Sequence, residues 1–182
     1  MGADPRLDPY DAELNMNRIP QILACCLALS VAVPVMAQDT ETARLVLVGD
    51  LESRSTVVET SVMKPFDVYL VAERDSDASQ ISTVAFTLGI PEGLLVVGEE
   101  VLVKSLIALG TPKSGLNLAF HCIEAKRVPV FRFRLVATQS VEAVKLRVLP
   151  DTRTEFRGVV SCRDENYVKW EADESSFTVT AR

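Results

Sequence analysis

Four basic side chains alternate with apolar residues along two neighbouring segments of the sequence. Arg132 and Arg134 lie in the apolar segment Val130–Ala137. Lys145 and Arg147 lie in the next one. If the two segments pair as a hairpin, all four cations point outward on one sheet face, where they could bind a uronic polysaccharide or a carboxylate-rich protein. A solvated face with edge-protecting charges explains the same pattern.

No side chain has the setting of a catalytic group. His121 is the sole histidine, and a general-base or metal-binding role needs partners at reachable positions. Ser114 and Glu124 are near it in sequence, but the chain lacks a nucleophile motif such as Gly-x-Ser-x-Gly. We therefore interpret His121 as an ordinary surface residue, and we predict no enzymatic activity and no cofactor.

Acidic side chains gather in the turn that follows Phe66–Glu73. Glu73, Asp75 and Asp77 carry the hard oxygen ligands that Ca²⁺ prefers. Their spacing lacks the glycine and the distal glutamate of an EF-hand loop. The pattern favours a solvated turn, so the sequence predicts no metal site.

Two cysteines, Cys122 and Cys162, remain once a leader that contains the other two is set aside. An even pair in an exported domain indicates one disulfide. The bond would close a loop of about 41 residues and contribute roughly 4 kcal/mol on the chain-entropy account. A metal site is disfavoured because the two thiols lack the close spacing of zinc ligands.

Few aromatic side chains could stack on a sugar ring. The candidates are Tyr69, Tyr167 and Trp170. In one strand, Tyr167 and Trp170 are three positions apart and therefore face opposite ways. They do not make a flat platform, and we interpret Trp170 as a core or rim residue.

The N-terminal region is predicted to be a secretory leader. A positive start at Arg18, an uncharged apolar stretch and small residues up to Ala37 are typical of a signal peptide over residues 16–37. A membrane anchor is disfavoured because prolines shorten the apolar stretch, and a lipoprotein signal at Cys25 has too brief an apolar segment before it. Residues 1–15 are interpreted as a disordered leader or a start assigned too early. The mature domain, 38–182, is expected to be secreted or periplasmic and not stably inserted in a membrane.

The overall charge gives the protein no reason to collect nucleic acid or anionic lipid. The net charge is −6, and the hydrophobic and charged fractions, 48% and 24%, are those of a globular protein. Another secreted or cell-surface protein, or a polysaccharide, is the expected partner.

From residue 42 onward the dominant period of the sequence is two, which indicates strands with one buried and one solvated face. In Val130–Ala137, for example, Phe131, Phe133 and Leu135 share a face opposite the arginines. Such strands, separated by turn residues, predict one all-β sandwich domain with jelly-roll or Greek-key topology and about nine strands. Glu99–Leu109 is the one segment whose pattern fits a helix as well as a strand.

The order of the strands resembles that of cohesin-like modules of secreted bacterial proteins. The resemblance is carried by Phe66–Asp77, by the segment Ser82–Val97, by Val130–Val136 and by the closing strand Phe177–Thr180. It implies a nine-stranded jelly roll whose role is protein–protein recognition, with dockerins as the partners of classical cohesins. A carbohydrate-binding module on the same fold is the alternative. No dockerin-contact residue carries over to this sequence.

Overall fold

The described part of the chain consists of β-strands joined by turns and loops. The computed structural model describes residues 43–74, 80–162, 168–171 and 175–182, all within the unit Asp39–Arg182. The predicted leader and signal segments, 1–15 and 16–37, lie outside these residues. The strands are β1 (Ala43–Val48), β2 (Val57–Thr60), β3 (Phe66–Arg74), β4 (Gln80–Gly89), β5 (Leu94–Val101), β6 (Ser105–Thr111), β7 (Gly115–Glu124), β8 (Arg127–Ala137), β9 (Val141–Leu149), β10 (Gly158–Ser161), β11 (Val168–Glu171) and β12 (Ser175–Ala181).

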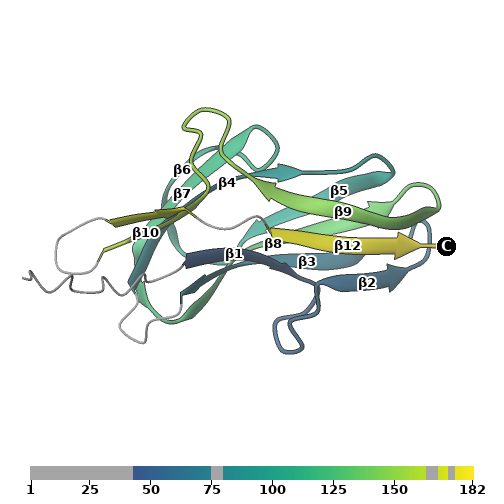
Figure 1. Ribbon diagram of the computed structural model, residues 1–182, viewed down its shortest axis with the longest axis horizontal. Helices are drawn as coiled ribbons and strands as arrows, with labels where there is room; N and C mark the ends of the chain where they lie inside the picture. The colour runs from purple at the N-terminus through teal and green to yellow at the C-terminus, as the bar shows by residue number, and fades with distance from the viewer. Residues whose placement is uncertain (1–42, 75–79, 163–167, 172–174) are drawn as a thin grey trace, which may run out of the picture. The chain divides into compact units, whose positions relative to one another are not determined.

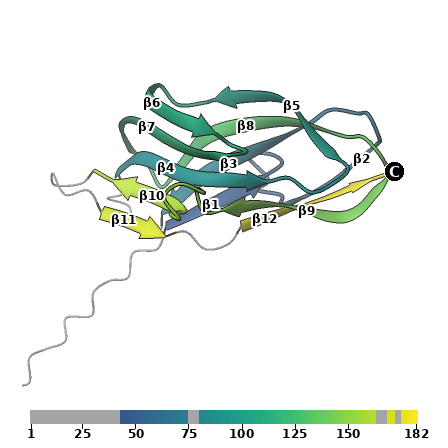
Figure 2. The ribbon, with the colours of Figure 1, turned by 90° about the horizontal axis from the view of Figure 1, so that it is seen from above.

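The strands form two sheets that pack face to face (Figures 1 and 2). The first sheet has the order β1-β3-β8-β5. The second has eight strands, with a main path of β11-β10-β4-β9-β12-β2 and with β7 and β6 attached to β4. Because Val84 of β4 pairs with both Val159 of β10 and Leu118 of β7, these two strands occupy opposite edges of β4. The predicted all-β sandwich is therefore confirmed.

The segment whose pattern fitted either a helix or a strand is extended. Glu99–Leu109 contains the end of β5 and most of β6, with a short connection between them. The described residues contain twelve strand segments where about nine were expected. Part of the difference arises because this apolar run is divided between two strands that belong to different sheets. Which strands pair with each part of the run is not encoded locally.

The core lies between the two sheets and is centred on phenylalanine rings. Phe131 and Phe133 of β8 stack with their centroids 4.7 Å apart, and Phe86 of β4 meets each of them edge-on at 6.4 Å. All three side chains are buried, together with Leu135. Such ring pairs add about 0.5–1.5 kcal/mol each beyond the burial of apolar area. The predicted inward face of β8 is thus confirmed.

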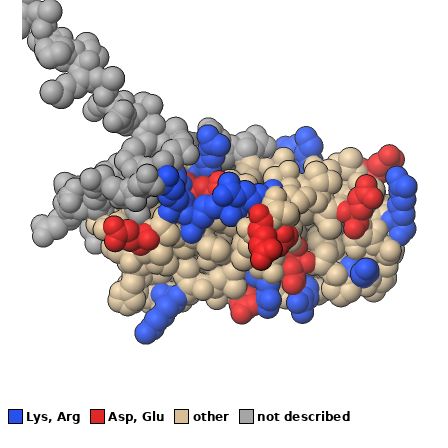
Figure 3. Space-filling model, turned by 90° about the horizontal axis from the view of Figure 1, so that it is seen from below, with Lys and Arg blue, Asp and Glu red and all other residues tan. Residues whose placement is uncertain are grey.

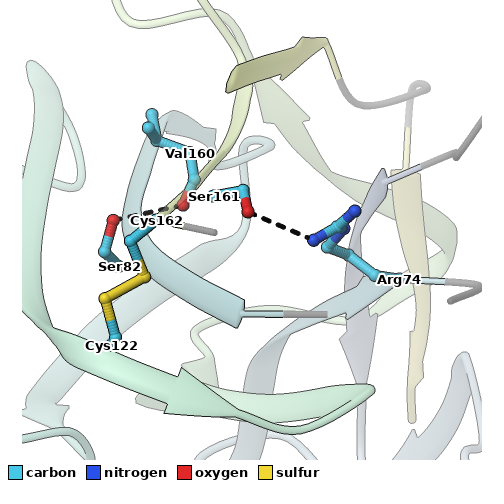
Figure 4. Close-up of a disulfide and its surroundings, with 6 residues drawn as sticks. All are labelled: Arg74, Ser82, Cys122, Val160, Ser161 and Cys162. Atoms are coloured by element: carbon cyan, nitrogen blue, oxygen red, sulfur yellow. Dashed lines mark hydrogen bonds between the residues drawn. A yellow bond between two sulfur atoms is a disulfide. The ribbon is translucent and has the colours of Figure 1, made fainter. Parts of the chain in front are cut away.

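The predicted disulfide is present between Cys122 and Cys162, with the two Cα atoms 6.3 Å apart. It joins the end of β7 to the residue after β10, so it links the strands on the two edges of β4 (Figure 4). Beside it, the hydroxyl of Ser82 on β4 donates a hydrogen bond to the carbonyl of Val160 on β10, at 3.3 Å. The covalent bond therefore reinforces a part of the sheet where three strands meet.

Cys122 does not share the buried face of β7, although strict alternation along the strand would place it there. Leu118 and Phe120 are buried, but Cys122 is exposed. The register shifts here, because Thr83 of β4 pairs with Ala119 whereas Ile81 pairs with Ile123. The extra residues on β7 form a bulge, which changes the side-chain phase and turns Ile123 toward the core instead.

The β6–β7 hairpin is held by the loop that follows β9. The carboxylate of Asp151 is buried and accepts hydrogen bonds from Asn117 of β7 at 2.5 Å and from the backbone N–H of Arg153 at 2.8 Å. The guanidinium of Arg153 donates in turn to the carbonyls of Leu109 at 2.9 Å and Gly115 at 3.0 Å. The guanidinium of Arg153 also donates to the carboxylate of Asp151, at 2.9 and 3.2 Å, and these hydrogen bonds lower the pKa of Asp151. The loop thus positions β6 at the edge of its sheet.

Candidate functional site

The four cations singled out from the sequence do not share a sheet face. Arg132 and Arg134 are on β8, which pairs with β3 and β5 of the first sheet. Lys145 and Arg147 are on β9, which pairs with β4 and β12 of the second sheet. The expected β8–β9 hairpin is wrong, because the chain crosses from one sheet to the other over the short connection between these strands. The cations therefore form two separate pairs.

On the outer face of the first sheet, arginines lie opposite carboxylates on neighbouring strands. Arg134 donates two hydrogen bonds to Asp67 of β3, at 2.9 and 3.1 Å. Arg132 forms an ion pair with Glu100 of β5. The hydrogen bonds from Arg134 lower the pKa of Asp67. Both arginines therefore have carboxylate partners on neighbouring strands. Figure 3 shows basic and acidic side chains interspersed on the face that it draws.

A third cross-strand pair on this sheet involves Glu73, one of the acidic residues considered for calcium. Its Oε1 accepts a hydrogen bond from Nε of Arg127 at 2.5 Å, and Arg127 also donates to the carbonyl of Leu51 at 3.2 Å. Asp75 and Asp77 lie outside the described residues. Among the residues that the structure does describe, no group of three or more His, Cys, Asp and Glu could hold a metal ion.

Each cation pair borders its own shallow hollow. Arg132 and Arg134 line one of about 330 Å³ beside Gly98, where the missing side chain leaves room, and Glu99 and Glu100 also line it. Lys145 and Arg147 line one of about 560 Å³ between β4 and β9, with Gly89, Ile90, Pro91, Ala143 and Val144. The second hollow has two cations and no acidic residue in its lining. It is therefore the better suited of the two to an anionic group.

Exposed apolar side chains concentrate on β5, on β6 and in the connection between them. Of the ten large apolar side chains that are exposed in the described part of the chain, seven lie here. We call this group the β5–β6 apolar surface; it consists of Leu95, Val97, Val101, Leu102, Leu106, Ile107 and Leu109. On β6 the exposed fractions of the side chains are 57% at Leu106, 56% at Ile107 and 57% at Leu109. Exposed apolar side chains that gather in one region of the surface are a feature of interaction sites in soluble proteins.

The side-chain period of the sequence does not predict the β5–β6 apolar surface. The run from Val101 to Leu109 is apolar at almost every position, which is typical of a strand or helix buried on both sides. In the structure β6 is an edge strand and all seven of its residues are exposed. The lack of alternation in this run was the available signal of an unusual strand. Only the strand order shows that nothing in the described chain covers β6.

The remaining sequence candidates do not gather into a site. His121 is exposed on β7, where a surface histidine was expected. Tyr69 lies on β3, on the outer face opposite Arg132. Tyr167 and the side chain of Trp170 lie outside the described residues. No helix of the described chain is long and apolar enough to cross a membrane.

The fold is similar to that of solved cohesin modules. A cohesin module of a family 33 glycoside hydrolase from Clostridium perfringens superimposes with a TM-score of 0.51 at 13% identity, over 78% of this chain and 98% of that one. The seventh ScaB type I cohesin of Pseudobacteroides cellulosolvens gives 0.52 at 11% identity, over 78% and 94%. The sixth cohesin of Acetivibrio cellulolyticus scaffoldin B, solved in complex with a Cel5 dockerin mutant, gives 0.52 at 12% identity, over 78% and 99%.

These likenesses establish a cohesin-like β-sandwich and confirm the resemblance seen in the strand order. No protein-family profile and no curated protein matches the sequence. At identities of 11–13% the agreement extends to the fold alone. Function must therefore be argued from the chain's own surfaces.

Proposed function

We propose that this protein is an exported, non-catalytic recognition module that binds another protein through the β5–β6 apolar surface. The cohesin-like fold supports a binding role, since the Acetivibrio cellulolyticus neighbour and a second neighbour, CaCohA2, were solved in complexes with dockerins. The predicted signal peptide and the disulfide support export, because disulfides persist in oxidising compartments.

The observation that carries the proposal is the concentration of exposed apolar side chains on one flank of the sandwich. Monomeric soluble proteins rarely expose contiguous apolar area unless a partner covers it. The centres of protein interfaces are depleted in charged residues and are more apolar than the rest of the protein surface. On β6 the segment Ser105–Thr111 has no charged residue at all, so the flank has the composition of an interface core.

The test is partner capture by the purified protein, followed by titration with the identified partner. Ile107→Asp and Leu109→Asp place a charge in the middle of the surface and are expected to weaken binding at least tenfold. Val57→Asp is the matched control, because Val57 is 52% exposed and lies on a different edge strand. Purified Cel5 dockerin is included as a defined probe. Binding that survives both β6 substitutions would overturn the proposal.

A second candidate function is recognition of an acidic polysaccharide at the hollow lined by Lys145 and Arg147. Both side chains are exposed, and no acidic residue lines the hollow. Carboxylate groups of a uronic glycan would there meet two cations. Selective binding to acidic glycans on an array, without a protein partner, would favour this candidate over protein recognition.

A further inference from the structure

In the part of the chain that the structure describes, no strand pairs with the outer edge of β6. Among the described residues, β6 pairs only with β7, and Figure 2 shows it at the margin of its sheet. A strand bonded on one edge leaves a row of N–H and C=O groups on the other, and that row is a template for an additional strand.

Two other edge strands, β5 and β2, carry features that hinder such pairing. The edge strand β5 has a register shift at Gly98 followed by Glu99 and Glu100. The edge strand β2 is four residues long and contains Glu59. β6 has seven residues, none of which is charged or proline. Short length, charge and irregularity are the usual protections of an edge. β6 has a register shift between Ser105 and Ile107, but it is neither short nor charged.

The side chains and flanking charges of β6 indicate what would pair with it. Ile107 and Leu109 share one face of the strand and would contact apolar side chains of an added strand. Lys104 and Lys113 lie just beyond the two ends of β6, are exposed, and form no ion pair within the described chain. An added strand with an acidic residue at each end would bring a carboxylate to each lysine.

We propose that β6 binds an extended segment of the partner protein as an added β-strand, and that this segment is apolar in its middle and acidic at both ends. The proposal rests on the proposed function, in which the β5–β6 apolar surface is the protein-binding site. A second copy of the chain fits this edge less well, because antiparallel pairing of β6 with itself brings the Lys104 end of one strand toward the Lys113 end of the other.

The test uses a defined peptide, Asp-Thr-Val-Thr-Val-Thr-Val-Thr-Asp, and the full chain. Fluorescence anisotropy is expected to show binding that is about tenfold tighter than for the same peptide with lysine at both ends. Hydrogen–deuterium exchange is expected to slow at the β6 amides when the peptide binds. Ile107→Lys is expected to abolish both effects, and Val57→Lys to leave them unchanged.

Several outcomes would overturn strand addition. Two of them are equal affinity for the two peptides and binding without protection of the β6 amides. The third is a dimer of the free protein that Ile107→Lys dissociates, because a second copy would then be the occupant of this edge. The proposed function fails separately. If Ile107→Lys abolishes binding of a natural partner but that partner leaves the β6 amides unprotected, the proposed function stands and only the mode of binding is overturned. If a natural partner binds Ile107→Lys as well as the wild-type protein, both are overturned.

Discussion

Arg134 on β8 lies directly opposite Asp67 on β3 and donates two parallel hydrogen bonds to its carboxylate, from Nε to Oδ1 at 2.9 Å and from Nη2 to Oδ2 at 3.1 Å. The guanidinium favours the charged carboxylate and holds the pKa of Asp67 below its ordinary value of 3.8. We expect Arg134→Gln to raise the pKa of Asp67 toward that value, as measured by NMR titration of the carboxyl carbon. Arg132→Gln is expected to have a smaller effect, because Arg132 acts on Asp67 only through space.

The buried carboxylate of Asp151 should make stability depend on pH. Hydrogen bonds from Arg153 lower its pKa in the folded state, so its contribution is present above the unfolded pKa and is lost as the pH falls through the folded one. We expect the free energy of unfolding in urea to fall below about pH 4–5, and we expect Asp151→Asn to flatten this decline while lowering stability at neutral pH. Glu142→Gln, on the exposed side of β9, is the control. An acid decline of the same steepness in Asp151→Asn would contradict this prediction.

The disulfide is expected to stabilise the domain substantially. Cys122 and Cys162 are 40 residues apart in sequence, and closing such a loop restricts the unfolded chain. Replacing both by serine should lower the free energy of unfolding by about 2–4 kcal/mol. Equilibrium denaturation with and without reductant measures this, and the double variant should respond to reductant no further. A wild-type protein whose stability is insensitive to reductant would contradict the prediction.

Gly115 and Gly98 offer a matched pair of glycine substitutions. Gly115 has φ of +101°, and an added Cβ would lie 2.3 Å from Oδ1 of Asp151. Gly98 has an ordinary φ, and an added Cβ would lie 3.4 Å from the Cβ of Arg134. Gly115→Ala should therefore cost on the order of 2–4 kcal/mol, and Gly98→Ala less than about 1 kcal/mol, in thermal or urea denaturation. Equal losses would show that the Asp151 loop does not constrain the hairpin.

The two cation pairs should differ in their effect on acidic ligands. Arg132 and Arg134 pair with carboxylates that lie on their own face of the sheet. The hollow that Lys145 and Arg147 line has no acidic residue in its lining. If an acidic glycan binds, we expect Lys145→Gln/Arg147→Gln to weaken its affinity about tenfold and Arg132→Gln/Arg134→Gln to change it less than threefold. Isothermal titration calorimetry provides the comparison. The reverse order would place the anion site on the first sheet.

Much of the fold was predictable because its determinants are local. The alternation of Phe131, Phe133 and Leu135 with Arg132 and Arg134 assigns a strand with one buried face, and the structure buries that face. The pairing of Cys122 with Cys162 followed from there being only two cysteines beyond the predicted leader. Side-chain period and residue count belong to the sequence itself, and they were enough to establish an all-β sandwich.

The functional surfaces depended on which strands are neighbours, and side-chain period does not encode that. The alternation of Lys145 and Arg147 shows that they face solvent, but only the strand order places them on the opposite sheet from Arg132 and Arg134. The apolar residues of β6 have the composition of a core strand, and they are exposed because β6 is at an edge. Strand order is decided by how the whole core packs and by where loops such as that of Asp151 hold a hairpin. The sequence by itself therefore determined which segments form strands, and the tertiary structure decided which strands are neighbours and which are left at an edge.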